Sequence, residues 1–290
     1  MLLSRGEKIL QGVNVLLLTL IAVATVFPVF YVVSVSLTPM GVVARHGGFL
    51  VIPRQITFDA YKFLLSQHLI PRAYLNTLTV TALGTTINMV LTTVMAYPLA
   101  RRSLPGRNAL LVFVLIPMLF SGGLIPLFIL VKNLDLINTY WAVVLPGAIS
   151  SYNLLVMKGF FEGLPEELFE SAQLDGATDF TVLMRIVLPL SKPVLATLGL
   201  FYGVGHWNGF WYPLMFLTDR KLQTLQVVLR DVLMDAMSNE MEEVLEYVQL
   251  LPGETLKMAA VMLSVLPLLI VYPFLQKYFT KGVLLGSIKG

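Results

Sequence analysis

The residues best suited to chemistry form a short run near the end of an apolar stretch. The run reads Gly205-His206-Trp207-Asn208, followed by Phe210, Trp211 and Tyr212. Aromatic faces can stack on sugar rings, and imidazole and amide groups can hydrogen-bond to hydroxyls. Because an ionisable side chain is costly inside a membrane, His206 is expected to be functional and to face the protein interior. The alternative interpretation is an aromatic belt at the outer membrane interface beside a packed structural histidine.

A second candidate is a polar stripe in another apolar stretch. Thr81, Thr85, Asn88 and Thr92 are spaced so that they share one face of a helix. Lipid cannot satisfy such a stripe, so it should face other helices or a wet cavity. The competing interpretation is that the threonines bond their own helix backbone and Asn88 joins neighbouring helices. The predicted solute pathway therefore consists of six residues, which are Thr81, Thr85, Asn88, His206, Trp207 and Asn208.

Patterns for enzymatic chemistry are missing from the sequence. The three histidines, His46, His68 and His206, are far apart and form no metal-ligand pattern. The sequence has no G-x-x-x-x-G-K-[ST] phosphate loop, and no candidate nucleophile has an ordered base partner. We therefore expect a non-enzymatic protein that itself binds no cofactor and no metal.

The composition predicts the class of protein that must position these residues. Hydrophobic residues make up 57% of the 290 residues and charged residues only 13%, and the mean hydropathy is +0.79. Soluble domains carry about 25% charged residues, so the chain is predicted to be an integral membrane protein. The net charge of +3 is small and the basic residues are scattered, which gives no support for nucleic-acid binding.

Six apolar stretches are long enough to cross about 30 Å of hydrocarbon as helices. They are Ile9–Leu37, Asn76–Ala100, Ala109–Val131, Thr139–Met157, Val194–Leu217 and Thr255–Phe279. The predicted fold is therefore an all-α integral membrane bundle of six transmembrane helices. In the third stretch, Pro117, Ser121-Gly122-Gly123 and Pro126 predict a broken helix, which is tolerated beside a cavity. The first stretch stays apolar beyond a possible cleavage site, which favours an uncleaved anchor over a signal peptide.

The basic residues predict the orientation in the membrane. Residues Arg101–Arg107 carry three positive charges and no acid between the second and third stretches, which is typical of a cytoplasmic loop. Both termini and the segment Pro165–Pro193 are then cytoplasmic as well. Two long connections, Thr38–Leu75 and Thr218–Glu254, are predicted to be extracytoplasmic.

The second of these long connections has features of a binding surface. It carries eight acidic residues against three basic ones. Within Gln226–Met237, the apolar residues recur at helical spacing and predict an amphipathic helix. We expect this loop to receive an external partner, and a merely solvated charged loop is the alternative.

The polar segment Pro165–Pro193 is punctuated like two short helices joined by a turn. Pro165 suits a first helical position, and the two acids that follow it favour the positive end of a helix. Gly176 can supply a left-handed turn, and Pro189 can close the unit before the next apolar stretch. In such apolar surroundings the segment indicates docking of a cytoplasmic partner, whereas the simpler interpretation is an ordinary loop.

The same segment resembles the EAA signature of ABC importer permeases, which reads E-A-A, three residues, Gly, nine residues and I-x-L-P. Ser171 stands in place of the usual first alanine, which is a small-for-small change. The predicted ATPase-coupling residues are Glu170, Ser171, Ala172, Asp175, Gly176, Ala177, Ile186, Leu188 and Pro189. In that family this loop forms coupling helices seated in a groove of a cytoplasmic ATPase. The resemblance implies that Glu170 and Gly176 are coupling residues.

The likeness extends over nearly the whole chain. Leu200–Asn208, Leu225–Arg230 and Lys277–Gly290 look like the second permease of oligosaccharide importers, in the subgroup similar to the lipoprotein-operon and alginate importers. The resemblance implies a type I ABC importer permease fold. It divides the chain into a first helix with its loop, residues 1–71, and a core permease domain, residues 72–290. The core would contain the coupling loop 158–193, the extracytoplasmic loop 218–254 and the cytoplasmic tail 277–290.

The resemblance also implies the partners and the function. The partners are a sister permease, a homodimeric cytoplasmic ATPase that binds ATP and Mg²⁺, and an extracytoplasmic solute-binding protein. Loop 218–254 would meet the binding protein, and the tail would reach the ATPase. The expected function is ATP-driven import of an oligosaccharide across the bacterial inner membrane, and both neutral and uronate-rich saccharides such as alginate fit. The alternative is a secondary transporter or channel for small polar solutes that works without ATP.

Overall fold

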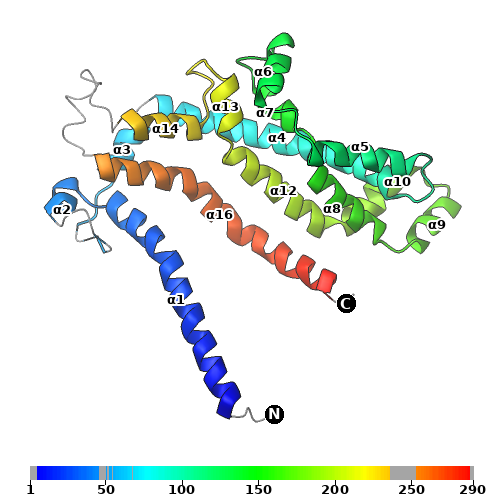
Figure 1. Cartoon of the computed structure of the whole chain (residues 1–290), viewed down its shortest axis with the longest axis horizontal. Coiled ribbons are helices and arrows are strands. Elements are labelled where there is room, and N and C mark those ends of the chain that lie inside the picture. Colours follow the sequence, from blue (N-terminus) through cyan, green and yellow to red (C-terminus); the bar gives the residue numbers. More distant parts are fainter. Residues whose placement is uncertain are drawn as a thin grey trace. The chain divides into compact units, whose positions relative to one another are not determined.

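The computed structural model describes residues 5–45, 50, 52–53, 55–66, 68–235 and 253–287, and all regular structure in these ranges is helical (Figure 1). Packing divides the chain into two compact units. The first unit combines Met1–Ile70 with Leu229–Pro267, and the second combines Pro71–Val228 with Leu268–Gly290. The predicted division at residues 71 and 72 stays a prediction.

Three helices are each long and apolar enough to cross a membrane. They are α1 (Arg5–Ser36), α4 (Leu69–Ala100) and the first part of α16 (Gly253–Ser287). Three bent pairs of helices supply the remaining spans. These are α5 (Arg107–Leu119) with α6 (Leu124–Asn133), α7 and η1 (Tyr140–Gly147) with α8 (Ser151–Glu162), and Asp179–Leu190 with α12 (Lys192–Trp207). With each pair counted as one span, the six-span prediction is confirmed.

The predicted break in the third span is present. The axes of α5 and α6 differ by 111°, and the chain turns between them at Ser121-Gly122-Gly123. Gly123 adopts a φ of +85°, a backbone conformation that side chains other than glycine rarely tolerate. Glycine therefore permits the sharp reversal that ends α5 and starts α6.

The fifth predicted span, Val194–Leu217, differs from the observed helices. α12 already ends at Trp207, and the separate short helix α13 (Trp211–Phe216) follows. The N–H of Asn208 still donates to the carbonyl of Val204 at 3.0 Å, but the next N–H turns back to His206 at 3.1 Å. This tight turn ends the helix, so a continuous apolar stretch is divided into two helices with different directions.

The core of the second unit joins the spans to the polar segment that follows α8. That segment contains α9 (Glu167–Leu174), α10 (Asp179–Val182), η2 (Leu183–Val187) and α11 (Leu188–Leu190). Its buried Phe169, Ala172 and Val182 belong to the same apolar cluster as Leu154 of α8 and Leu198 of α12. The polar segment is therefore packed into the helical core rather than suspended from it.

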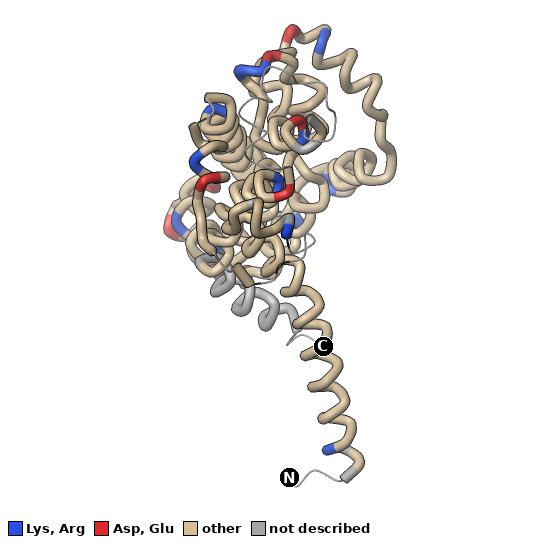
Figure 2. The backbone as a smooth tube through the Cα atoms, turned by 90° about the vertical axis from the view of Figure 1, so that its left-hand side faces the viewer, with Lys and Arg blue, Asp and Glu red and all other residues tan. Residues whose placement is uncertain are grey.

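The first unit is held by contacts near the end of α1, which leads into α2 (Met40–Arg45) and α3 (Asp59–Ser66). The hydroxyl of Tyr61 on α3 donates to Ser36 at 2.7 Å. Most of α1 carries no charge along its length (Figure 2), and its membrane-length window has none of its residues buried within the chain. An apolar helix of this kind needs lipid or another protein around it.

Candidate functional site

A helical hairpin over Glu167–Val182, made of α9 and α10, is the first candidate site. Gly176 lies between the two helices with a φ of +75°. The N–H of Ala177 donates to the carbonyl of Ala172 at 2.9 Å and closes the turn. The hydroxyl of Thr178 accepts the N–H of Thr181 at 3.3 Å and caps α10. The predicted pair of short helices with a left-handed glycine turn is confirmed.

The predicted coupling residues divide between the core and the surface. Ala172 is buried, and Ala177, Ile186 and Leu188 pack against the same core from partly buried positions. The remaining members of the set are exposed, namely Glu170, Ser171, Asp175, Gly176 and Pro189. The set therefore combines residues that hold the hairpin in place with residues that a partner can touch.

Sequence reasoning missed two exposed apolar residues beside the turn. Leu174 is 89% exposed at the end of α9, and Phe180 is 71% exposed in α10. They flank Asp175 and Gly176 in the chain, so a small apolar surface lies at the tip of the hairpin. A single exposed hydrophobic residue is ordinary, but two beside one turn suit a contact with another protein.

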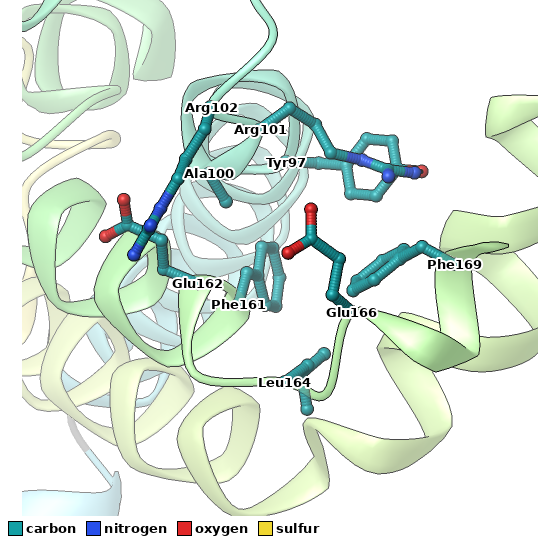
Figure 3. A pocket seen from close by; sticks show the side chains of 9 residues that line it. All are labelled: Tyr97, Ala100, Arg101, Arg102, Phe161, Glu162, Leu164, Glu166 and Phe169. Atoms are coloured by element: carbon teal, nitrogen blue, oxygen red, sulfur yellow. The ribbon is translucent and has the colours of Figure 1, made fainter.

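A guanidinium group attaches the hairpin to α4. Arg101, just after the end of α4, lies over the Phe169 ring at 4.2 Å and over the Tyr97 ring at 5.2 Å. It donates to the Tyr97 hydroxyl at 2.7 Å and pairs with the Asp179 carboxylate at 3.3 Å. Figure 3 shows Arg101 beside these rings, with Glu166 projecting into a cavity of about 150 Å³ between the hairpin and α4.

Ion pairs reinforce the neighbouring helix ends. Glu162 at the end of α8 pairs with Arg107 and, at 2.6 Å, with Lys158 one turn earlier. Arg107 also donates to the carbonyl of Leu99 at 2.8 Å. The Arg101–Arg107 region, which the sequence analysis used only to predict orientation, is therefore also a set of side chains that join α4, α5 and α8.

The second candidate site is a cavity of about 820 Å³ in the second unit. Asn88, His206 and Asn208 line it, together with Ser150 and Asn153. Aromatic rings also line it, from Phe201, Tyr202, Phe210, Trp211 and Tyr212. Such a lining offers hydrogen-bonding groups and flat faces, which are the two features that bind a polyhydroxylated ring.

Asn88 and His206 form one hydrogen-bonded unit at the wall of the cavity. His206 Nε2 lies 2.8 Å from Asn88 Oδ1, and Asn88 Nδ2 donates to the carbonyl of Gly147 at 2.6 Å. Gly147 ends η1 at the bend before α8, where the helix ladder is interrupted. Asn88 thus satisfies a backbone carbonyl that a broken membrane helix would leave without a partner.

The His206 side chain packs against α4 at Gly84, a residue that the sequence did not single out. A Cβ atom at this position would lie 2.4 Å from His206 Nε2. On α12 itself, a Cβ at Gly203 would meet Thr85 at an ordinary distance, and one at Gly199 would meet no atom within 4 Å. The signal that could have found Gly84 is its place one turn before Asn88 on the polar stripe.

The other predicted pathway residues do not line the cavity. Trp207 is 3% exposed and packs edge-on against Tyr74, with ring centroids 5.4 Å apart. The buried hydroxyl oxygens of Thr81 and Thr85 have no hydrogen-bond partner in the described part of the chain. The Thr92 hydroxyl hydrogen-bonds to the Tyr202 hydroxyl at 2.8 Å. The last residue of the polar stripe therefore joins α4 to α12.

A third feature is the segment that follows α13, residues 218–225. Asn76 of α4 donates to the carbonyls of Lys221 and Gln223, each at 2.9 Å, and accepts from Tyr140 at 2.9 Å. Thr77 accepts the N–H of Leu225 at 2.8 Å, where α14 (Leu225–Asp235) begins. The predicted amphipathic helix over Gln226–Met237 is thereby confirmed as far as residue 235. The rest of the predicted loop, residues 236–252, lies outside the described residues.

These features define a polytopic helical membrane protein whose second unit holds a packed polar hairpin and a cavity lined by aromatic and polar side chains. Residues 88–285 match the family described as "Binding-protein-dependent transport system inner membrane component". The chain belongs to this family, and its expected resemblance to importer permeases is confirmed.

Relatives and a solved structure cover almost the whole chain. It is 42% identical to Protein LplC of Bacillus subtilis (strain 168), over 99% of this chain and 97% of that protein. It is 41% identical to the polygalacturonan/rhamnogalacturonan transport system permease protein YtcP of the same organism, over 94% of this chain and 96% of that protein. A chain from the crystal structure of a bacterial ABC transporter involved in the import of the acidic polysaccharide alginate matches with a TM-score of 0.90. That match has 30% identity and covers 96% of this chain and 99% of the other, and it confirms the type I importer permease fold.

Proposed function

We propose that this chain is one of two permease subunits that together carry oligosaccharides into the bacterial cytoplasm, with ATP hydrolysed on separate subunits. The observation that carries the proposal is that α4 serves both candidate sites. Asn88 lines the cavity, whereas Tyr97 and Arg101 hold the hairpin. Asn88 and Arg101 are 13 positions apart, which corresponds to about 20 Å along a helix.

The hairpin is proposed to face the cytoplasm and to dock on the ATPase, which supplies the sites for ATP and Mg²⁺. Leu174 and Phe180 offer the apolar surface for this contact, and Glu170 and Asp175 offer charges beside it. The orientation follows from the three bases of the Arg101–Arg107 loop. Both termini are then cytoplasmic. The tail 277–290 is proposed to reach the ATPase as well, although residues 288–290 lie outside the described part of the chain.

The substrate class follows from the lining of the cavity. Aromatic faces at Phe210, Trp211 and Tyr212 suit sugar rings, and Asn88 and Asn208 suit their hydroxyls. Neither lysine nor arginine occurs among the described residues that line this cavity. Uronate carboxylates would therefore meet amide groups, hydroxyls and His206. The names of YtcP and of the alginate transporter support acidic saccharides as the first to be tested.

Transport in this proposal is alternating access, which ATP binding drives on the cytoplasmic side and the solute-binding protein drives on the outer side. ATP binding draws the two hairpins of the complex together, and this motion opens the cavity to the outside. A loaded solute-binding protein docks on the extracytoplasmic surface built around residues 218–235 and favours the same state. Because the binding protein has a higher affinity for the outward-open state, docking and hydrolysis are coupled.

The test is reconstitution of the complete complex in lipid vesicles with its binding protein. ATP hydrolysis is measured with oligogalacturonate, with alginate oligosaccharide, and with a neutral oligosaccharide of the same length. We expect one of these saccharides to stimulate hydrolysis and to accumulate inside the vesicles. Import without ATP, or the absence of stimulation by every saccharide in the panel, would contradict the proposal.

A further inference from the structure

We infer that Arg101 is the positioning residue that makes the coupling hairpin, Glu167–Val182, move together with α4. The inference rests on the proposed function and adds a residue outside the EAA signature to the coupling path. Three elements meet at this side chain. Tyr97 belongs to α4, Phe169 to α9 and Asp179 to α10.

The contacts of Arg101 are of unequal strength, and the stack on Phe169 is the main one. Phe169 is 9% exposed, and the guanidinium carbon lies 4.2 Å from its ring centroid. Cation–π contacts strengthen when both groups are removed from water. The Asp179 side chain, in contrast, is 78% exposed. Ion pairs of such exposed groups contribute little, so Asp179 orients the guanidinium more than it holds it.

The geometry also explains why an arginine is needed. A guanidinium is planar, so it can stack between rings and at the same time donate in its own plane. Arg101 Nη2 donates to the Tyr97 hydroxyl at 2.7 Å and to the Asp179 carboxylate at 3.3 Å. A lysine would keep the charge and a contact with one ring, but it could not reproduce this combination.

Arg101 links the hairpin by non-covalent contacts to α4, and α4 also reaches the cavity. A displacement of α9 has to carry the guanidinium with it or break the stack. The guanidinium is attached at the end of α4, and α4 carries Asn88 at the cavity wall. α4 stays helical across Pro98, which removes one backbone hydrogen bond between Asn88 and Arg101, and a continuous helix can pass a displacement of one end to the other.

The neighbouring Arg102 provides a matched control. It follows Arg101 directly, carries the same charge and lines the same small cavity. Figure 3 shows it on the opposite wall, beside Glu162 and away from Tyr97 and Phe169. Replacing Arg102 by glutamine removes a positive charge from the same loop without touching the stack. Any effect on membrane orientation or net charge should be equal in the two variants.

The experiment measures how many substrate molecules are imported per ATP hydrolysed by the reconstituted complex. Arg101→Gln is expected to assemble and keep its basal hydrolysis but to lower this ratio about tenfold, since it loses hydrogen bonds from a charged group and the stack. Arg101→Lys should fall between this variant and the wild type. Arg102→Gln and Asp179→Asn should remain within about twofold of the wild type.

A second variant and a docking reporter separate positioning from folding. Phe169→Leu keeps an apolar side chain in the core but removes the ring face, so it should lower the ratio as Arg101→Gln does. The chain has no cysteine, so Leu174→Cys at the exposed tip can be cross-linked to the ATPase as a measure of docking. We expect cross-linking of Leu174→Cys to be unchanged by Arg101→Gln while the ratio falls.

Two results would overturn the inference. One is an import ratio for Arg101→Gln equal to that of Arg102→Gln in an assembled complex. The other, if Arg101→Gln does not assemble, is a normal ratio for Phe169→Leu. Both leave the proposed function intact, because the wild-type complex still imports. A wild-type complex without saccharide-stimulated hydrolysis would instead contradict the proposed function, and the role of Arg101 with it.

Discussion

At the scale of single residues, two glycines are required for different physical reasons. Gly84 is required because of space, since His206 lies where its Cβ would be. Gly176 is required because of its backbone, since its φ is +75° and a Cβ there would meet nothing within 4 Å. Substitutions at the two positions should therefore affect different properties of the protein. A substitution at Gly84 should disturb packing, and one at Gly176 should disturb the coupling turn.

Gly84→Ala should lower the stability of the protein. The added methyl group pushes His206 away from Asn88, and overpacking of this kind costs about 1–3 kcal/mol. Thermal unfolding of the purified complex measures the loss. The control is Gly199→Ala on the facing helix, where a Cβ would meet no atom within 4 Å. The double variant Gly84→Ala/His206→Ala should recover stability relative to Gly84→Ala, and a Gly84→Ala protein as stable as Gly199→Ala would refute the packing argument.

Gly176→Asp should uncouple hydrolysis from import without preventing assembly. A left-handed backbone costs a residue with a Cβ about 1–2 kcal/mol, and the new carboxylate lies beside the apolar Leu174 and Phe180 at the proposed ATPase contact. Gly176→Asn isolates the effect of the charge, because asparagine has the size of aspartate and the same tolerance of this conformation but adds no charge. Gly106→Asp tests the same change at a similar φ of +71° in the other loop and should retain coupling. Normal saccharide-stimulated hydrolysis in an assembled Gly176→Asp complex would remove Gly176 from the coupling residues.

At the scale of elements, helix ends and breaks are satisfied by side chains from distant helices. Asn88 bonds the carbonyl of Gly147 at the break before α8. Asn76 performs the same task for the segment after α13, where it bonds the carbonyls of Lys221 and Gln223. In each case an amide of α4 orders an irregular backbone. α4 therefore acts as the scaffold of the second unit.

Asn76→Ala should weaken the response to the binding protein. The substitution leaves the Gln223 carbonyl and the Tyr140 hydroxyl without this partner, whereas the Lys221 carbonyl keeps the bond from Arg72 at 3.0 Å. Each buried unsatisfied group costs about 1–3 kcal/mol. The segment 218–225 should then lose its fixed shape. We expect the concentration of loaded binding protein needed for half-maximal hydrolysis to rise, with basal hydrolysis unchanged. Thr79→Ala is the control, because its hydroxyl only bonds its own helix at Leu75, and equal responses of the two variants would contradict a role for Asn76.

At the scale of the whole molecule, the chain has surfaces that it does not cover itself. The membrane-length window of α1 is not buried at all within the chain, against 28% of that of α4. Lipid can cover such a helix, and the hairpin tip exposes Leu174 and Phe180 as well. The family to which the chain belongs is a component of a larger transport system. The functional unit is therefore an assembly.

Purification in mild detergent should recover this assembly. We expect a second permease and an ATPase to accompany the chain, with two ATPase copies for each pair of permeases. Mass spectrometry of the intact complex gives the subunits and their numbers. A stable single chain or a homodimer without ATPase would favour the secondary-transporter alternative.

The sequence by itself determined those features that depend on neighbouring residues. Composition and the lengths of apolar stretches established the membrane class and the six spans, because the bilayer imposes a fixed thickness. The turn at Gly176 and the break at Ser121-Gly122-Gly123 were predictable because backbone conformation is a local property. The spacing of the EAA residues placed the hairpin for the same reason.

Only the tertiary structure decided which side chains meet. Asn88 and His206 are 118 positions apart, and nothing in either stretch shows that Gly84 makes their contact possible. Trp207 and His206 are adjacent, yet the helix directs Trp207 toward Tyr74 and His206 toward the cavity. The sequence indicated only that Arg101 helps to set the membrane orientation, whereas the structure places its guanidinium over the Phe169 ring. Such contacts are set by the packing of whole helices, which sums many weak interactions from distant parts of the chain.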